Sequence, residues 1–142
     1  MTTARDIMTD DAQCARAHET LTDAARKMRD LGVGALPICG EDDRLKGVLT
    51  DRDIVVRCVA EGADPTATPV SELAEGKPVT IGADDPIDEA LRTMIEYGVR
   101  RLPVIDGDRL VGMVSQADVA RETSPQQAGE LVAALSRAAD NN

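Results

Sequence analysis

Aromatic side chains are almost absent from this chain. Its 142 residues include no Trp, no Phe and a single tyrosine, Tyr97. A hydrophobic core must therefore be built from Val, Leu, Ile, Met and Ala, and a flat ligand would be held between aliphatic side chains instead of stacking on rings. Apolar residues still make up 42% of the sequence, which is enough for a globular fold of one or two small domains.

Basic residues are outnumbered, and long apolar runs are missing. The chain has 16 Lys and Arg against 26 Asp and Glu, a formal net charge of −10. This charge repels polyanions, and the sequence contains no basic stripe that could follow a phosphate backbone. Nucleic acid is therefore not an expected partner. No apolar run approaches the roughly 20 residues of a membrane span, and residues 1–11 contain no secretory signal. We expect a cytoplasmic protein without membrane contact and leave non-classical export open.

The sequence also lacks the usual means of catalysis. His18 is the only histidine, and there is no convincing Ser-His-Asp or Cys-His arrangement, no Walker loop and no Gly-x-Gly-x-x-Gly fingerprint. We therefore expect a protein that is not an enzyme. The three cysteines, Cys14, Cys39 and Cys58, are too few for the disulfide scaffold of a small secreted protein.

What the sequence does contain is an internal repeat. Three pairs of segments align: 4–7 with 70–73, 20–38 with 86–104, and 47–54 with 112–119. The last pair reads GVLTDRDI and GMVSQADV, so that Gly47 matches Gly112 and Asp53 matches Asp118. A repeat of this length predicts two similar structural units.

Each copy predicts a short strand, a helix, two strands and a second helix. Apolar residues recur at helical spacing after Thr20, which fits an N-cap, and before Gly32, a typical helix end; in the second copy Asp85 fits the N-cap. Two apolar runs around a polar turn then predict a hairpin, and the second helix follows Thr50 or Ser115. The sequence therefore predicts an α/β fold of the α+β type.

Glycine and prolines mark a linker between the two copies, and a further helical pattern follows the second. The predicted organisation is a first domain over 1–62, a linker over 63–69, a second domain over 70–123 and a C-terminal helical tail over 124–142.

The two closing segments share a Gly-x-x-hydroxyl-x-x-Asp-aliphatic pattern. Two units with this pattern resemble a pair of CBS domains, the tandem called a Bateman module, over roughly residues 4 to 122. The resemblance implies two CBS domains packed as a pseudo-twofold pair, a homodimer of such pairs arranged as a flat disc, and a regulatory role in hypoxia or another stress. It also implies that clefts between paired units bind an adenosine-containing ligand such as AMP, ATP, NAD or S-adenosylmethionine.

The repeated hydroxyl and aspartate residues are the candidate ligand-binding residues. Thr50 and Ser115 would lie beside unpaired helix N–H groups that favour a phosphate, and Asp53 and Asp118 could accept hydrogen bonds from both hydroxyls of a ribose. The competing interpretation is that each pair is an ordinary capping box, but duplication at matching places favours a ligand site. Aliphatic walls for adenine would come from Ile38, Val48, Ile54, Val104, Met113 and Val119.

The two copies differ in the basic residues near these pairs. Arg100 and Arg101 precede the second Leu-Pro-Val run, at positions that the CBS family often fills with a basic residue near the phosphate. Gly34 and Ala35 occupy the matching positions of the first copy. We therefore expect the two clefts to bind differently.

Cys14 and Cys39 lie on two predicted strands that are joined by a helix and can therefore be parallel neighbours. Three interpretations are open: a disulfide, two small core residues, or a zinc site completed by His18 when the thiols are reduced. The disulfide is favoured over zinc because three ligands without Cys-x-x-Cys spacing are a weak zinc signal. Cys58, on a helix, is expected to be a buried free thiol.

Two functions fit these residues. The first is a nucleotide sensor whose conformation or affinity for a protein partner changes with the ligand. The second is a stress-associated structural or interaction protein whose clefts no longer bind nucleotide and whose cysteines form a disulfide or a zinc site. Binding of a small-molecule nucleotide separates them.

Overall fold

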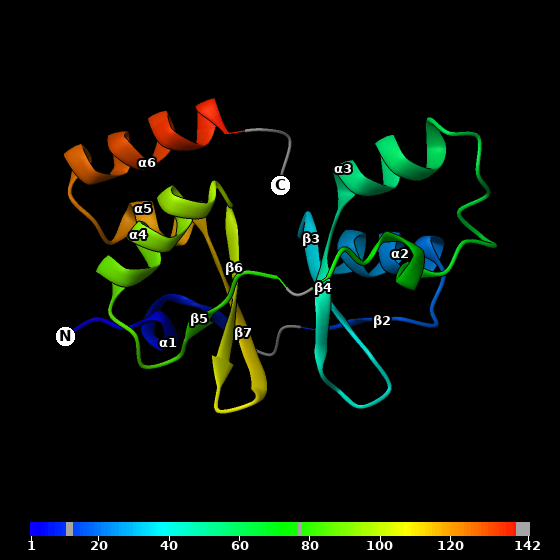
Figure 1. The fold of residues 1–142 in the computed structure, drawn as a ribbon, viewed down its shortest axis with the longest axis horizontal. Coiled ribbons are helices and arrows are strands. Elements are labelled where there is room, and N and C mark those ends of the chain that lie inside the picture. Colours follow the sequence, from blue (N-terminus) through cyan, green and yellow to red (C-terminus); the bar gives the residue numbers. More distant parts are fainter. Residues whose placement is uncertain (11–12, 77, 139–142) are drawn as a thin grey trace. The chain divides into compact units, whose positions relative to one another are not determined.

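The chain forms two compact units. The computed structural model describes residues 1–10, 13–76 and 78–138. We call the units unit 1, which consists of Met1–Ala12 and Val79–Asn142, and unit 2, which consists of Gln13–Pro78. Each unit is a small sheet packed with helices (Figure 1). The predicted mixed α/β class is confirmed.

Unit 2 has the predicted order of elements. Its elements are β2 (Ala15–Arg16), α2 (Leu21–Leu31), β3 (Ala35–Cys39), β4 (Leu45–Thr50), α3 (Asp51–Ile54), the π-helical segment η1 (Val55–Val59) that continues α3, and the short 3-10 helix η2 (Val70–Leu73). The sheet order is β2-β3-β4, with β2 parallel to β3 and β4 antiparallel to it. The predicted hairpin is thus β3 and β4.

Unit 1 repeats this order and adds elements at both ends. Its elements are α1 (Ala4–Ile7), β1 (Thr9–Asp10), β5 (Ile81–Gly82), α4 (Ile87–Tyr97), β6 (Arg101–Asp106), β7 (Arg109–Ser115), α5 (Gln116–Arg121) and α6 (Pro125–Arg137). The sheet order is β1-β7-β6-β5, with β5 parallel to β6 and the other pairs antiparallel.

The ends of α2 and α4 have identifiable causes. The Asp23 N–H donates to Thr20 Oγ1 over 3.1 Å at the start of α2, as predicted, and Gly32 ends the helix at φ 68°, a left-handed conformation that glycine adopts without a Cβ clash. The predicted N-cap of α4 was wrong. Pro86 precedes the helix, and the Asp85 carboxylate instead accepts from the Gly82 N–H over 2.9 Å.

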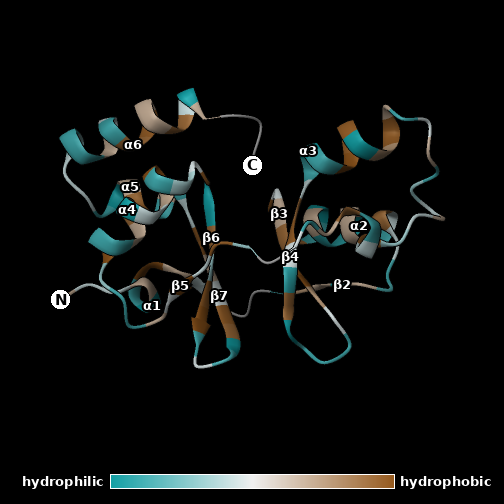
Figure 2. Ribbon diagram, in the orientation of Figure 1, coloured by the Kyte–Doolittle hydropathy of each residue, from teal (hydrophilic) through white to brown (hydrophobic). Residues whose placement is uncertain are grey.

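Both cores are aliphatic, as the composition requires. Figure 2 shows hydrophobic residues, in brown, along β4 and β7, and hydrophilic residues in the turns that join the hairpin strands. The core of unit 1 also contains Leu131 and Leu135 from α6, both almost fully buried. The helix predicted as a tail over 124–142 therefore contributes to the core of unit 1, because its apolar stripe packs inward.

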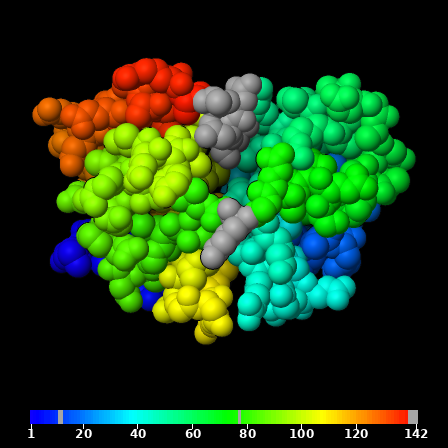
Figure 3. All heavy atoms as spheres, viewed as in Figure 1, coloured from blue at the N-terminus to red at the C-terminus, as the bar shows by residue number. Residues whose placement is uncertain are grey.

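We call the segments that precede the two copies, 4–10 and 70–73, the lead-in segments; each belongs to the unit formed by the other copy. Thr9 and Asp10 pair with Met113 and Gly112 in the unit 1 sheet, whereas η2 belongs to unit 2, where the Val70 N–H donates to Glu19 O over 2.7 Å. Figure 3 shows the first residues, in blue, against the green residues of the same unit. The compact units thus divide the chain differently from the predicted boundaries at 62 and 70. Pairing between distant segments leaves no periodic signal in the sequence.

Candidate functional site

The hydroxyl and aspartate of the first motif meet where β4 ends and α3 begins. The Asp53 N–H donates to Thr50 Oγ1 over 3.0 Å, and the Thr50 N–H donates to Asp53 Oδ2 over 2.9 Å. Thr50 is 2% exposed, so its hydroxyl is occupied by the cap. Within the described residues, the contacts of the Asp53 carboxylate use Oδ2 and leave Oδ1 available.

The second motif forms the same arrangement between β7 and α5. The Asp118 N–H donates to Ser115 Oγ over 3.2 Å, and the Ser115 N–H donates to Asp118 Oδ2 over 2.8 Å. Asp118 differs from Asp53 because its Oδ1 also accepts from Arg121, one helical turn further on. Arg121 was not predicted as part of the site, although its spacing of three residues from Asp118 is the spacing of a helical ion pair.

Both motif copies are therefore capping boxes in this structure. The same geometry occurs at Thr20 and Asp23, where both hydrogen bonds measure 3.1 Å. A hydroxyl followed three residues later by an acid thus marks a helix start wherever this arrangement forms in the chain. Because the capping geometry is shared, only the groups around each capping box can distinguish a ligand role for Asp53 or Asp118.

The two arginines have different positions. Arg101 faces Ser115 in the antiparallel β6–β7 ladder, next to the start of α5. Arg100 instead donates from Nη2 to Leu135 O of α6 over 3.2 Å. In unit 2, Ala35 faces Thr50. The difference between the copies that the sequence predicts is thus located at one ladder position, with a cation in unit 1 and a methyl group in unit 2.

The residues expected to form walls for adenine are mostly core residues. Ile38, Ile54, Val104 and Val119 are buried, whereas Val48 and Met113 are partly exposed. The four buried residues pack in the hydrophobic cores of their own units.

Unit 2 has an open hollow between α2 and α3. Its volume is about 470 Å³, and it is lined by Ala25, Met28, Arg29, Gly32, Val33, Gly34, Asp51, Ile54 and Val55. Two of these lining residues, Val33 and Val55, are exposed apolar side chains, and Leu31 in α2 and Val59 in η1 are exposed as well. We call these four residues the apolar surface of unit 2.

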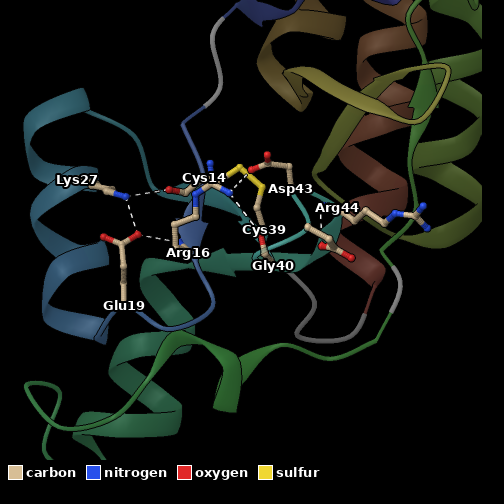
Figure 4. The surroundings of a disulfide bond; sticks show 9 residues. Cys14, Arg16, Glu19, Lys27, Cys39, Gly40, Asp43 and Arg44 are labelled. Atoms are coloured by element: carbon tan, nitrogen blue, oxygen red, sulfur yellow. Dashed lines mark hydrogen bonds and ion pairs between the residues drawn. A yellow bond between two sulfur atoms is a disulfide. The ribbon is translucent and has the colours of Figure 1, made fainter.

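The two predicted cysteines are joined by a disulfide in unit 2. Their Cα atoms are 5.6 Å apart, and β2 and β3, which hold or adjoin them, run parallel as the sequence predicts. Figure 4 shows the polar residues around the bond. Lys27 Nζ donates to Cys14 O over 2.9 Å and to Glu19 Oε1 over 2.7 Å. Cys58 is a buried free thiol, which confirms that prediction.

Glu19 is held in its charged form beside this bond. Partial burial raises the pKa of the Glu19 carboxyl, but hydrogen bonds from Lys27 Nζ and from the Arg16 N–H outweigh burial, and the pKa lies below its usual value of 4.5. Lys27 and Glu19 were not predicted here, because Lys27 belongs to α2 and Glu19 to the turn before it.

The predicted zinc ligands do not fit a metal in this form. Cys14 and Cys39 are bonded to each other and offer no thiolate, and His18 lies exposed in the turn after β2. Within residues 1–10, 13–76 and 78–138, no cluster of three or more His, Cys, Asp or Glu side chains is arranged to hold a metal ion.

Across the described part of the chain, none of the helices combines the length and apolarity needed to cross a membrane.

Comparison with known proteins identifies the family. The CBS domain profile matches residues 4–59 and 70–124. Hypoxic response protein 1 of Mycobacterium tuberculosis is 50% identical over 135 residues, which cover 95% of this chain and 94% of the relative.

Two solved structures are similar. The crystal structure of Hypoxic Response Protein I with two coordinated zinc ions superposes with a TM-score of 0.78 and 52% identity, covering 87% of this chain and all of that one. The crystal structure of CBSX2 in complex with AMP gives a TM-score of 0.72 at 23% identity, covering 86% of this chain and 96% of that one. The chain therefore belongs to the CBS-domain family and carries two copies of the domain.

Proposed function

We propose that this CBS pair is a regulatory protein that binds an adenosine-containing ligand, with Asp53 as the ribose acceptor. The observation that carries the proposal is the Asp53 carboxylate, whose Oδ2 is fixed by the Thr50 N–H while Oδ1 stays available within the described residues. A fixed carboxylate with an available oxygen can accept from the vicinal hydroxyls of a ribose without prior rearrangement. CBSX2, which shares the fold, was crystallised with AMP, and that structure supports the choice of ligand class.

Unit 1 offers a different set of groups. Arg101 beside Ser115 supplies a cation that suits a phosphate, whereas Asp118 already accepts from Arg121. A ribose bound at Asp118 has to replace this ion pair. At the unit 1 motif we therefore assign phosphate recognition to Arg101, and we expect ribose to bind more weakly at Asp118 than at Asp53 of unit 2.

The test is a thermal-shift screen of the purified protein with AMP, ATP, NAD, S-adenosylmethionine and unphosphorylated adenosine. A ligand that binds only the folded protein raises its apparent stability by about 2.7 kcal/mol at one hundred times the Kd. We expect a shift with at least one phosphorylated ligand and a smaller shift for that ligand with Arg101→Met. No shift with any of the five compounds would contradict the proposal.

We further propose a homodimer that buries the apolar surface of unit 2. Val55 and Val59 are each more than half exposed on one continuous helical segment, and Leu31 and Val33 lie at the end of α2 beside it. Exposed apolar residues gathered in this way favour burial against a second copy. Light scattering at micromolar concentration should give a dimer mass for the native protein and a monomer mass for Val55→Glu. A native monomer would contradict the dimer.

A second candidate function rests on Cys14 and Cys39. Their adjacency, together with the zinc ions in Hypoxic Response Protein I, supports a stress-associated interaction protein. In this candidate function, reduction of the disulfide frees two thiols as ligands for zinc. A cytoplasmic location, which we also propose, would supply the reducing conditions. Reduced, metal-free protein should take up one zinc ion per chain, and Cys14→Ser with Cys39→Ser should take up none; equal uptake by both would refute this candidate.

A further inference from the structure

An arginine shares the face of the sheet on which the disulfide lies. In the parallel β2–β3 ladder, Arg16 is the partner of Cys39, and Ala15 is the partner of Ile38. Ala15 and Ile38 are fully buried in the core of unit 2. Because side chains alternate along a strand, Arg16, Cys39 and Cys14 project from the opposite face.

The guanidinium of Arg16 is held near the end of β3. Its Nη1 donates to the carbonyl of Gly40, the residue after Cys39, over 3.4 Å, and it forms an ion pair with the Asp43 carboxylate. Figure 4 shows this contact between Arg16 and Asp43 together with the disulfide. Asp43 lies in the turn between β3 and β4, and its side chain is largely exposed. Its backbone has the left-handed conformation, with φ 61°.

The two sulfur atoms differ in access. Cys39 is 1% exposed, whereas Cys14 is partly exposed. A thiolate from solution therefore reaches Cys14, and the sulfur that must leave is that of Cys39. A thiol leaves faster when its pKa is lower, and a neighbouring cation lowers the pKa of a thiol.

We propose that the Cys14–Cys39 disulfide is reduced by a dithiol, and that Arg16 is a positioning residue that stabilises Cys39 as the leaving thiolate. This proposal does not depend on nucleotide binding.

The reaction balances with a dithiol as the reductant. One thiolate of the reductant attacks Cys14 Sγ, the Cys14–Cys39 bond breaks, and its electron pair goes to Sγ of Cys39, the strand partner of Arg16. The second thiol of the reductant loses its proton to water and attacks the mixed disulfide, so that Cys14 leaves as a thiolate. The reductant departs as its own disulfide, and the two cysteine thiolates take up protons according to their pKa values.

Two substitutions should change the rate of reduction in opposite directions. Arg16→Met removes the cation, and we expect reduction by dithiothreitol at pH 7 to slow about three- to tenfold. Asp43→Asn removes the carboxylate that competes for Arg16, and we expect faster reduction; asparagine also tolerates the left-handed conformation of residue 43. Arg92→Met, on the exposed face of α4 in unit 1, makes the same charge change and should leave the rate unchanged.

Trapping identifies the sulfur that is attacked. With a monothiol such as 2-mercaptoethanol, acid quenching and peptide mapping should find the mixed disulfide on Cys14. Arg16→Lys keeps a cation and should fall between the native protein and Arg16→Met, which also covers the case in which Arg16→Met does not fold. Equal rates for Arg16→Met and Arg92→Met, an unchanged or slower rate for Asp43→Asn, or a mixed disulfide on Cys39 would each overturn the proposal.

Discussion

The glycine that opens each repeated motif should respond in opposite ways to one added methyl group. In unit 1, a Cβ on Gly112 would lie 2.7 Å from Thr9 O, 2.5 Å from Met8 Sδ and 2.9 Å from Met8 Cγ. The Met8 side chain can move aside, but Thr9 O belongs to β1, which pairs with β7 at this point. Overpacking of this kind costs about 1–3 kcal/mol, so we expect Gly112→Ala to lower the free energy of unfolding by that amount.

Gly47 is the matched control in unit 2. A Cβ there would meet Ala74 Cα and Ile38 Cδ1 at 3.6 Å, which is ordinary van der Waals contact. Alanine restricts the unfolded chain more than glycine, so Gly47→Ala should be neutral or stabilising by about 0.5–1 kcal/mol. Urea unfolding of both variants and the native protein, with the disulfide intact, measures the difference. Equal destabilisation by the two substitutions would refute the packing assigned to Met8 and Thr9.

Three further predictions test the core, the polar cluster and the disulfide. In urea unfolding, Leu131→Ala should lower the free energy of unfolding by about 2–5 kcal/mol, whereas Val132→Ala should lower it by less than about 0.5 kcal/mol. The two residues are neighbours on one helix, but Leu131 is buried in the core of unit 1 and Val132 is exposed. The folded-state pKa of Glu19 is lowered, so its stabilisation is present above pH 4.5 and is lost as the pH falls through the folded value. Glu19→Gln should therefore lower the free energy of unfolding at pH 7, and its difference from the native protein should shrink as the pH falls below 4.5. The Cys14–Cys39 bond closes a loop with a sequence separation of 25, and the double serine variant should lose about 3 kcal/mol relative to the oxidised protein in urea unfolding; no loss would contradict its stabilising role.

The sequence predicted the repeat well because each copy is encoded locally. Helical spacing after Thr20, the left-handed glycine at 32 and the apolar runs of the hairpins depend on residues close together in the chain. The disulfide could also be expected, because two strands joined by one helix become parallel neighbours. The exchange of lead-in segments could not, since the pairing of Thr9 with Met113 depends on which distant edge is free.

The candidate site was only partly predictable for a related reason. Spacing alone indicated that Ser115 and Asp118 begin a helix, but not that Arg121 occupies the second carboxylate oxygen. Nor did spacing separate Arg100, which binds the backbone of α6, from Arg101, which faces Ser115. Such choices are made by tertiary packing, which places several candidate partners within reach of one side chain.

Asp23 offers the most direct test of the ligand site, because it caps α2 with the geometry that Asp53 has at α3. Both Asp23→Ala and Asp53→Ala should lose about 0.5–1.5 kcal/mol of stability, since each removes the carboxylate that accepts from the N-cap N–H in a capping box. Titration calorimetry with the ligand that gives the largest shift in the thermal screen should then separate them. We predict that Asp23→Ala binds like the native protein and that Asp53→Ala binds roughly ten- to a hundredfold more weakly, because the carboxylate hydrogen bonds to ribose are lost. Equal affinities for the two variants would contradict a ligand role for Asp53 and leave it a helix cap.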